Sequence, residues 1–212
     1  KNLLSIGIPT AGENLAWNIG QLMILSMVNA LGTSYIASRT YLMLVATFVM
    51  TFSISLGQGT AIQVGQLVGA HEPEEAYKKC FKSLKLSIVL AFVVTSIVVI
   101  FKRNIMGIFT TDPAILEISL KVFPLMIILE VGRVFNIVII NSLHAAGDIK
   151  FPMFMGIIFI FIVAVLFSYI LGIKLGWGLV GIWIANAADE WCRAIAMLLR
   201  WKSRKWESKR FV

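Results

Sequence analysis

Six apolar stretches dominate this sequence, and each is long enough to cross the hydrocarbon core of a lipid bilayer. A helix needs about 20 residues for such a crossing. The stretches run over residues 3–31, 35–68, 83–101, 115–146, 151–171 and 177–199. The sequence therefore predicts an all-α integral membrane protein, with six transmembrane helices in residues 1–199 and a basic cytoplasmic tail in residues 200–212.

Composition supports a membrane protein and excludes other classes. The chain is 58% apolar and only 14% charged, a balance that soluble domains do not have. A net charge of +8 would suit nucleic acid, but the basic residues lie at the ends of the apolar stretches instead of forming one patch. We therefore expect the lipid bilayer as a partner, and no nucleic acid. Cys80 and Cys192 lie in no metal-binding or redox spacing, so both are expected to be free thiols, with no cofactor.

Lysine and arginine are distributed unevenly between the two sides that six crossings would create. One side holds twelve of the nineteen, whereas the other holds three, and four lie within or at the edges of the stretches. Because basic residues are enriched on the cytoplasmic side of a membrane, both ends of this segment are expected to be cytoplasmic. The twelve are Lys1, Lys78, Lys79, Lys82, Lys85, Lys150, Arg200, Lys202, Arg204, Lys205, Lys209 and Arg210, and the three are Lys102, Arg103 and Lys174.

The first stretch carries a row of polar residues on one helical face. Successive helical residues are about 100° apart, which places the members of this row within an arc of roughly 140°. Lipid does not tolerate such a face, so it should point at protein or at a water-filled cavity. The row consists of Glu13, Asn14, Trp17, Asn18 and Gln21. Glu13 is the candidate for binding a proton or Na⁺, and the alternative is a neutral acid that hydrogen-bonds a neighbouring helix.

The second and fourth stretches carry polar residues that could line the same cavity. Thr51 and Gln58 belong to a polar row on the second stretch, although hydroxyls in apolar helices often bond back to the preceding turn. On the fourth stretch, Glu130, Arg133 and Asn141 share one side. Glu130 and Arg133 are i,i+3 neighbours, so mutual neutralisation is the structural alternative to a place in the cavity.

The sixth stretch carries four polar residues within an arc of about 100°. They are Asn186, Asp189, Glu190 and Arg193. Asp189 and Arg193 can form an i,i+4 pair, whereas Glu190 has no obvious partner nearby in the sequence. Glu190 is therefore a further candidate for the cavity.

Three connecting segments give local predictions. A helix over residues 76–85 would carry apolar side chains on one face and four lysines on the other. This pattern predicts a short amphipathic helix in the headgroup plane between the second and third crossings. Residues 102–113 are expected to form a short loop that ends at a Thr-Asp-Pro helix start. In the tail, Trp201 and Trp206 are suited to the membrane–water interface.

Two motifs resemble the multidrug and toxic compound extrusion (MATE) transporter family. Residues 57–76 read GQGTAIQVGQLVGAHEPEEA, which is similar to the cytoplasmic end of the second helix in each six-helix lobe of that family. Residues 143–153 read LHAAGDIKFPM and resemble a family turn, with His144 in place of the usual arginine. Small residues in the first motif would let helices approach closely. The resemblance covers nearly the whole chain but only one lobe of a two-lobe transporter.

The resemblance implies a function. It implies that this chain is the C-terminal lobe, and so half, of a secondary-active exporter in the cell membrane. Such an exporter exchanges Na⁺ or H⁺ for small amphipathic, often cationic, compounds. The partner would be an N-terminal lobe of the same polypeptide, and a chain that begins with Lys1 fits a fragment. The acid that some members carry on the fourth helix is replaced here by Arg133, with Glu130 one turn away.

Other functions remain as alternatives. One is a lipid-linked oligosaccharide flippase of the same superfamily, which a basic cavity would favour. Another is a non-transporting membrane scaffold, in which the polar rows would hold helices together. An enzyme is not expected, because the chain has no Gly-rich phosphate loop, and the sequence His71-Glu72 lacks the second histidine of a zinc protease helix.

Overall fold

The computed structural model describes the backbone of residues 2–209 and the side chains of residue 7 and residues 11–209. This described part is built from helices and contains no strand, which confirms the all-α prediction. The long helices are α1 (Asn2–Leu31), α2 (Thr33–Gly69), α3 (Pro73–Ile100), α5 (Pro113–Ala145) and α7 (Gly178–Lys202). Helix α6 (Lys150–Phe159) continues through the π-helical segments η1 (Ile160–Val165) and η2 (Ser168–Lys174). Two shorter helices are α4 (Lys102–Phe109) and the 3-10 helix η3 (Lys205–Lys209).

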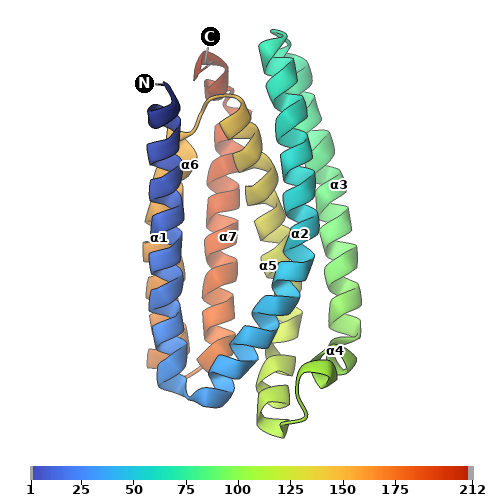
Figure 1. The fold of residues 1–212 in the computed structure, drawn as a ribbon, viewed down its shortest axis with the longest axis vertical. Helices are drawn as coiled ribbons and strands as arrows, with labels where there is room; N and C mark the ends of the chain where they lie inside the picture. The colour runs from blue at the N-terminus through green and yellow to red at the C-terminus, as the bar shows by residue number, and fades with distance from the viewer. Residues whose placement is uncertain (1, 210–212) are drawn as a thin grey trace.

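The long helices lie side by side along the long axis of the molecule, with α5 near the centre (Figure 1). Helix α5 packs against α2, α3 and α7, whereas α1 packs against α6, η1 and α2. Two clusters of buried apolar side chains fill these contacts. One includes Ile24, Leu42 and Phe123, and the other includes Leu143 and Trp201.

Within residues 2–209, four segments are both long enough and apolar enough to cross a membrane. They are Thr33–Gly69, Pro73–Ile100, Pro113–Ala145 and Lys150–Lys174. Helices α1 and α7 span 30 and 25 residues, which is also sufficient length. They carry the polar rows noted above, and their membrane crossing stays a prediction.

Of the four glycines in the 57–76 motif, Gly57 is the one at which close helix packing requires the absence of a Cβ atom. A Cβ atom added to Gly57 would lie 2.6 Å from Ile137 Cγ2, so α2 and α5 approach closely there. Gly65 lies against Ala145 in ordinary contact, whereas Gly59 and Gly69 have no neighbour within 4 Å of such an atom. The motif therefore sets the α2–α5 contact through only part of its length.

Two of the local predictions are wrong. Residues 76–85 do not form a separate helix at the membrane surface, because α3 runs unbroken from Pro73 to Ile100. No proline or glycine interrupts this segment, and Ala76, Cys80 and Leu84 are buried against the protein. Residues 102–109 form α4 instead of a loop. The Thr-Asp-Pro helix start is confirmed, since the Asp112 carboxylate accepts a hydrogen bond from the Ala114 amide at 2.8 Å.

The tail tryptophans also differ from the prediction, because both are buried within the protein. Trp201 and Trp206 are 0% and 1% exposed, and their rings stack with centroids 4.3 Å apart. Trp206 Nε1 donates to the carbonyl oxygen of Trp201 at 3.1 Å. The Arg204 guanidinium lies over the Tyr77 ring and donates to Glu74 Oε2 at 2.6 Å. The tail therefore ties the end of α7 to the start of α3.

The start of α1 and the 3-10 helix η3 lie at the same end of the molecule (Figure 1). The α2–α3 turn and the α5–α6 turn are at that end too, and the four lysines of α3 all lie in its first half. The predicted cytoplasmic residues Lys1 and Arg210 lie outside the described residues. The chain runs along the length of the molecule an even number of times, which brings the start of α1 and the helix η3 to the same end. Which side of the membrane this end faces stays a prediction.

The Trp201–Trp206 stack predicts a loss of stability when one ring is removed. Replacement of a buried aromatic residue by alanine typically costs about 3–5 kcal/mol. We expect Trp206→Ala, made in the full-length protein that contains this segment, to lower the thermal unfolding midpoint in detergent. The control is Trp177→Ala, because Trp177 is 53% exposed. Equal effects of the two substitutions would contradict a structural role for the stack.

The uneven distribution of basic residues predicts the orientation of the segment. Single cysteines are placed at Lys174 and Lys150 in a cysteine-free full-length protein, and intact cells are treated with a membrane-impermeant maleimide. We expect labelling at position 174 and protection at position 150, because the end with more basic residues should face the cytoplasm. The opposite pattern would overturn the orientation.

Candidate functional site

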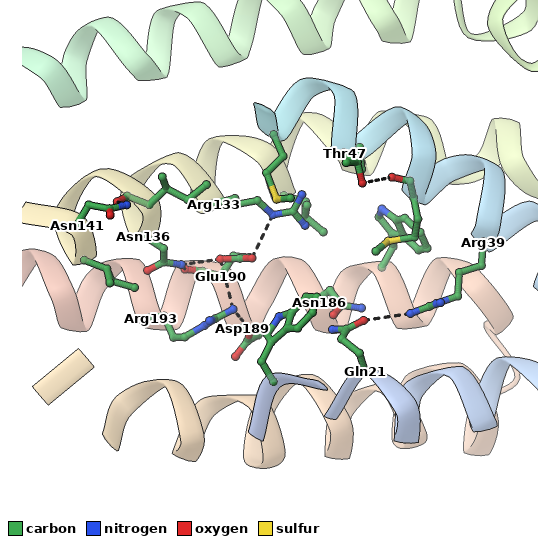
Figure 2. A pocket seen from close by; sticks show the side chains of 18 residues that line it. Gln21, Arg39, Thr47, Arg133, Asn136, Asn141, Asn186, Asp189, Glu190 and Arg193 are labelled. Carbon is green, nitrogen blue, oxygen red and sulfur yellow. Dashed lines mark hydrogen bonds and ion pairs between the residues drawn. The ribbon is translucent and has the colours of Figure 1, made fainter. Parts of the chain in front are cut away.

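A cavity of about 360 Å³ opens between α1, α2, α5 and α7. Its wall combines polar and charged side chains with methionine, aliphatic and tryptophan side chains. Figure 2 shows the polar ones converging from four helices. They are Gln21 on α1, Arg39 and Thr47 on α2, Arg133, Asn136 and Asn141 on α5, and Asn186, Asp189, Glu190 and Arg193 on α7.

An ionic network joins α5 to α7 on the wall of this cavity. Arg133 Nη1 donates to Glu130 Oε1 at 2.6 Å, and Arg133 Nε donates to Glu190 Oε1 at 3.3 Å. Asn136 Nδ2 donates to Glu190 Oε2 at 2.6 Å. The predicted Glu130–Arg133 neighbour pair is therefore confirmed. Glu190 has hydrogen-bond partners on α5, more than 50 residues away in the sequence, and an ion-pair partner on its own helix, Arg193, three residues on. The expectation that Glu190 has no partner nearby in the sequence is therefore wrong.

Arg193 extends the network along α7. Its Nη2 atom donates to Asp189 Oδ2 at 2.5 Å and lies 3.4 Å from Glu190 Oε2. The i,i+4 pairing expected for Asp189 and Arg193 is thus confirmed. With Glu130 and Arg133, the network contains three carboxylates and two guanidinium groups. Fully ionised, it would carry one excess negative charge.

Some atoms of this network have no hydrogen-bond partner among the described residues. They include Glu130 Oε2 and Asp189 Oδ1, both of which are buried. Buried polar atoms are normally paired, because an unpaired one has lost its water without a replacement. A carboxylate oxygen without a donor is where a proton or a small cation can bind. Glu130 is 0% exposed, so such binding there would occur within the protein, away from bulk water.

A second cavity of about 220 Å³ lies on the other side of Arg193. It is lined by Glu13, Asn14, Trp17, Gly156 and Arg193. Glu13 packs over Gly156, where an added Cβ atom would lie 3.1 Å from Glu13 Oε1. Trp17 and Arg193 belong to both cavities, so they form the partition between them.

The structure brings most of the predicted site residues to these two cavities. Trp17, Gln21, Arg133, Asn141 and Glu190 line the larger cavity, and Glu13 and Asn14 line the smaller one. Glu130 lies behind Arg133 in the network.

Three predicted site residues line neither cavity. Asn18, Thr51 and Gln58 are exposed on the surface of α1 and α2. Asn18 Nδ2 donates to the Asn14 carbonyl at 2.8 Å, and Thr51 Oγ1 donates to the Thr47 carbonyl at 2.9 Å. Thr51 therefore follows the alternative given for hydroxyls in apolar helices, in which the side chain bonds back to the preceding turn.

The sequence-based candidates omitted six polar residues of the larger cavity, namely Arg39, Thr47, Asn136, Asn186, Asp189 and Arg193. Arg39 is a charge within an apolar stretch, which by itself indicates a cavity position. Asn136 follows Arg133 by three residues and so shares its face. Asp189 and Arg193 were recognised only as a local pair.

Comparison with known proteins identifies the family. A sequence model of the MatE family matches residues 9–170. The chain belongs to the MATE family of transporters. It is 39% identical over 209 residues to the "Uncharacterized transporter YisQ" of Bacillus subtilis, covering 99% of this chain and 46% of the relative. It is 27% identical to the "Probable multidrug resistance protein NorM" of Thermotoga maritima, covering 99% of this chain and 45% of the relative.

Solved MATE structures share this fold. The bent form of the MATE transporter VcmN from Vibrio cholerae matches with a TM-score of 0.88 at 14% identity, covering 96% of this chain and 46% of that one. An outward-facing multidrug resistance MATE transporter matches with a TM-score of 0.87 at 19% identity and the same coverage. This MATE chain therefore spans less than half the length of the relatives it matches, as a single lobe would.

The Glu130–Arg133 pair predicts a strong penalty when only one partner is removed. We expect Arg133→Met in the full-length protein to cost about 3–5 kcal/mol, because it leaves Glu130 buried with an unpaired charge. The double variant with Glu130→Gln should recover much of that loss, since no charge is then stranded. Thermal unfolding in detergent measures both effects.

The matched control on the same helix is Lys121→Met. Lys121 pairs with Glu117 at 2.7 Å, but both side chains are largely exposed, so water can replace the contact. We expect the unfolding midpoint to change little. If Arg133→Met behaves like this control, the network does not stabilise the lobe.

Proposed function

We propose that this chain is the C-terminal lobe of a secondary-active exporter that expels amphipathic, often cationic, compounds in exchange for Na⁺ or H⁺. The observation that carries this proposal is the position of Arg193. It lies on the wall of both cavities, near Glu13 in one and paired with Asp189 and Glu190 in the other. One guanidinium group is therefore shared between two sets of acids.

Shared use of Arg193 provides a physical route to exchange. While Glu13 is negatively charged, it attracts Arg193 and weakens the hold of that arginine on Asp189 and Glu190. The acids of the larger cavity are then more available to a cationic compound. When a proton or Na⁺ neutralises Glu13, Arg193 compensates those acids more fully. Each ligand then lowers the affinity for the other, because coupling between two sites is reciprocal.

The relatives favour multidrug export over the other functions. Several of the similar proteins are named "Probable multidrug resistance protein", among them those from Thermotoga maritima and Mannheimia succiniciproducens. A lipid-linked oligosaccharide brings phosphates but no cationic group, so it would leave the excess carboxylate of the ionic network without a partner. A scaffold has no use for a cavity of about 360 Å³ with charged walls.

The proposal includes the rest of the transporter. One lobe provides half of a central cavity, so we expect an N-terminal lobe of the same polypeptide to supply the other half. Rocking of the two lobes would expose the cavity alternately to the two sides of the cell membrane. The energy would come from the ion gradient, with no bound cofactor and no enzymatic step.

Glu13→Gln in the full-length protein tests the exchange. Glutamine keeps the shape of glutamate but does not ionise, so Arg193 would stay permanently engaged with Asp189 and Glu190. We expect normal amounts of protein in the membrane and at least a tenfold loss of export of tetraphenylphosphonium from energised vesicles. The matched control is Glu72→Gln, because Glu72 is exposed in the α2–α3 turn. Normal export by the Glu13→Gln variant would remove Glu13 from the mechanism.

A further inference from the structure

Arg39 is the one cavity arginine that is held by an amide and not by an acid. It extends from α2 at one end of the larger cavity, and Arg39 Nη2 donates to Gln21 Oε1 on α1 at 3.0 Å (Figure 2). Arg133 and Arg193, at the other end, are each bonded to carboxylates. Among the described residues, Arg39 forms no ion pair.

The absence of an acid beside Arg39 applies to every Asp and Glu side chain of the sequence. All eleven Asp and Glu residues lie between positions 13 and 207, within the part that the structure describes. Arg39 is only partly exposed and sits within an apolar helix. A charge without compensation in such a place is costly, and it is retained where it serves a function.

The contact with Gln21 leaves most of the guanidinium group available. A guanidinium has five N–H donors, and the Gln21 oxygen accepts from Nη2 only. The same contact fixes the direction of the side chain toward the cavity. Arginine presents paired donors that match the two oxygens of a carboxylate or phosphate. Arg39 is thus oriented to bind an oxyanion.

The two ends of the cavity differ in charge. Arg39 is positive at one end, while the network around Glu190 has one more carboxylate than guanidinium groups at the other (Figure 2). The cavity wall also includes Met43, Met50 and Trp183, which suit an apolar or aromatic body. A ligand that matches both charged ends and this apolar part of the wall has an anionic end, an apolar body and a cationic end.

We propose that Arg39 is the anion-recognising residue of this cavity and that the preferred cargo is zwitterionic, with a carboxylate or similar oxyanion that binds Arg39. This inference rests on the proposed function, because it takes the cavity to be the place where cargo binds. It narrows the cargo from cationic compounds in general to those that also carry an oxyanion. The rival source of the oxyanion is an acidic side chain from the rest of the polypeptide.

Two dyes of almost identical shape test the proposal. Rhodamine 110 is a zwitterion with a free carboxylate, and rhodamine 123 is its methyl ester and a cation. Binding of each to the purified full-length protein is measured by fluorescence polarisation, for the parent, for Arg39→Gln and for Arg39→Lys. The control is Arg103→Gln, since Arg103 is exposed on α4, away from the cavity.

The expected result is selective. A hydrogen bond to a charged group contributes enough that Arg39→Gln should weaken rhodamine 110 binding roughly tenfold to a hundredfold. Rhodamine 123 should change by less than about twofold, because the ester carries no charge for Arg39 to bind. Arg39→Lys should retain part of the preference, since it keeps the charge but loses the paired donors. Arg103→Gln should leave both dyes unaffected.

Three results would overturn the inference. One is an equal loss of both dyes in Arg39→Gln, together with reduced thermal stability, as expected if Arg39 pairs with an acid elsewhere in the polypeptide. Another is no loss of either dye. The third is failure of the parent to bind rhodamine 110 at concentrations up to about a hundred times those that saturate other cargo. Export of tetraphenylphosphonium is measured in parallel, so that its persistence in any of these cases would leave the exporter proposal standing.

Discussion

The contact between Arg133 on α5 and Glu190 on α7 is the interaction on which the centre of this lobe depends. Charges in a membrane protein have little water to solvate them, so each must find a partner from another helix or from its own. Arg133 and Glu190, with Asn136, fix the rotation of α5 and α7 relative to one another. Once that rotation is set, the polar faces of both helices point into one cavity.

The same constraint explains how charge is arranged around the cavity. Acids and arginines on α5 and α7 compensate one another almost completely, and Arg193 extends that compensation toward Glu13 on α1. Arg39 has only the Gln21 amide, because α1 and α2 bring no carboxylate to it. The lobe thus separates a compensated, slightly acidic end from an uncompensated basic end. If cargo binds in this cavity, as proposed above, the arrangement distinguishes ligands by the placement of their charges as well as by their size.

Packing away from the cavity keeps these helices in position. Gly57 lets α2 approach α5 beside Asn141, so the glycine-rich motif contributes to the site through helix spacing and not through its polar side chains. At the end of the lobe that holds the α2–α3 turn, Trp201 stacks on Tyr77 of α3, and Arg204 joins Glu74. Both contacts link segments that are distant in the sequence.

The sequence by itself determined the helices and the pairs within one helix. Apolar length predicts α2, α3, α5 and the Lys150–Lys174 segment, and the helical repeat places Glu130 beside Arg133 and Asp189 beside Arg193. Only the tertiary structure decided which faces of distant helices meet. That choice gives Glu190 its partners on α5, leaves Arg39 with an amide, and places Thr51 and Gln58 outside the larger cavity. The physical reason is that the helical repeat of about 3.6 residues, which sets the neighbours of a residue within its own helix, is a local property of the chain. The rotation of that helix about its axis depends instead on packing against helices far along the sequence.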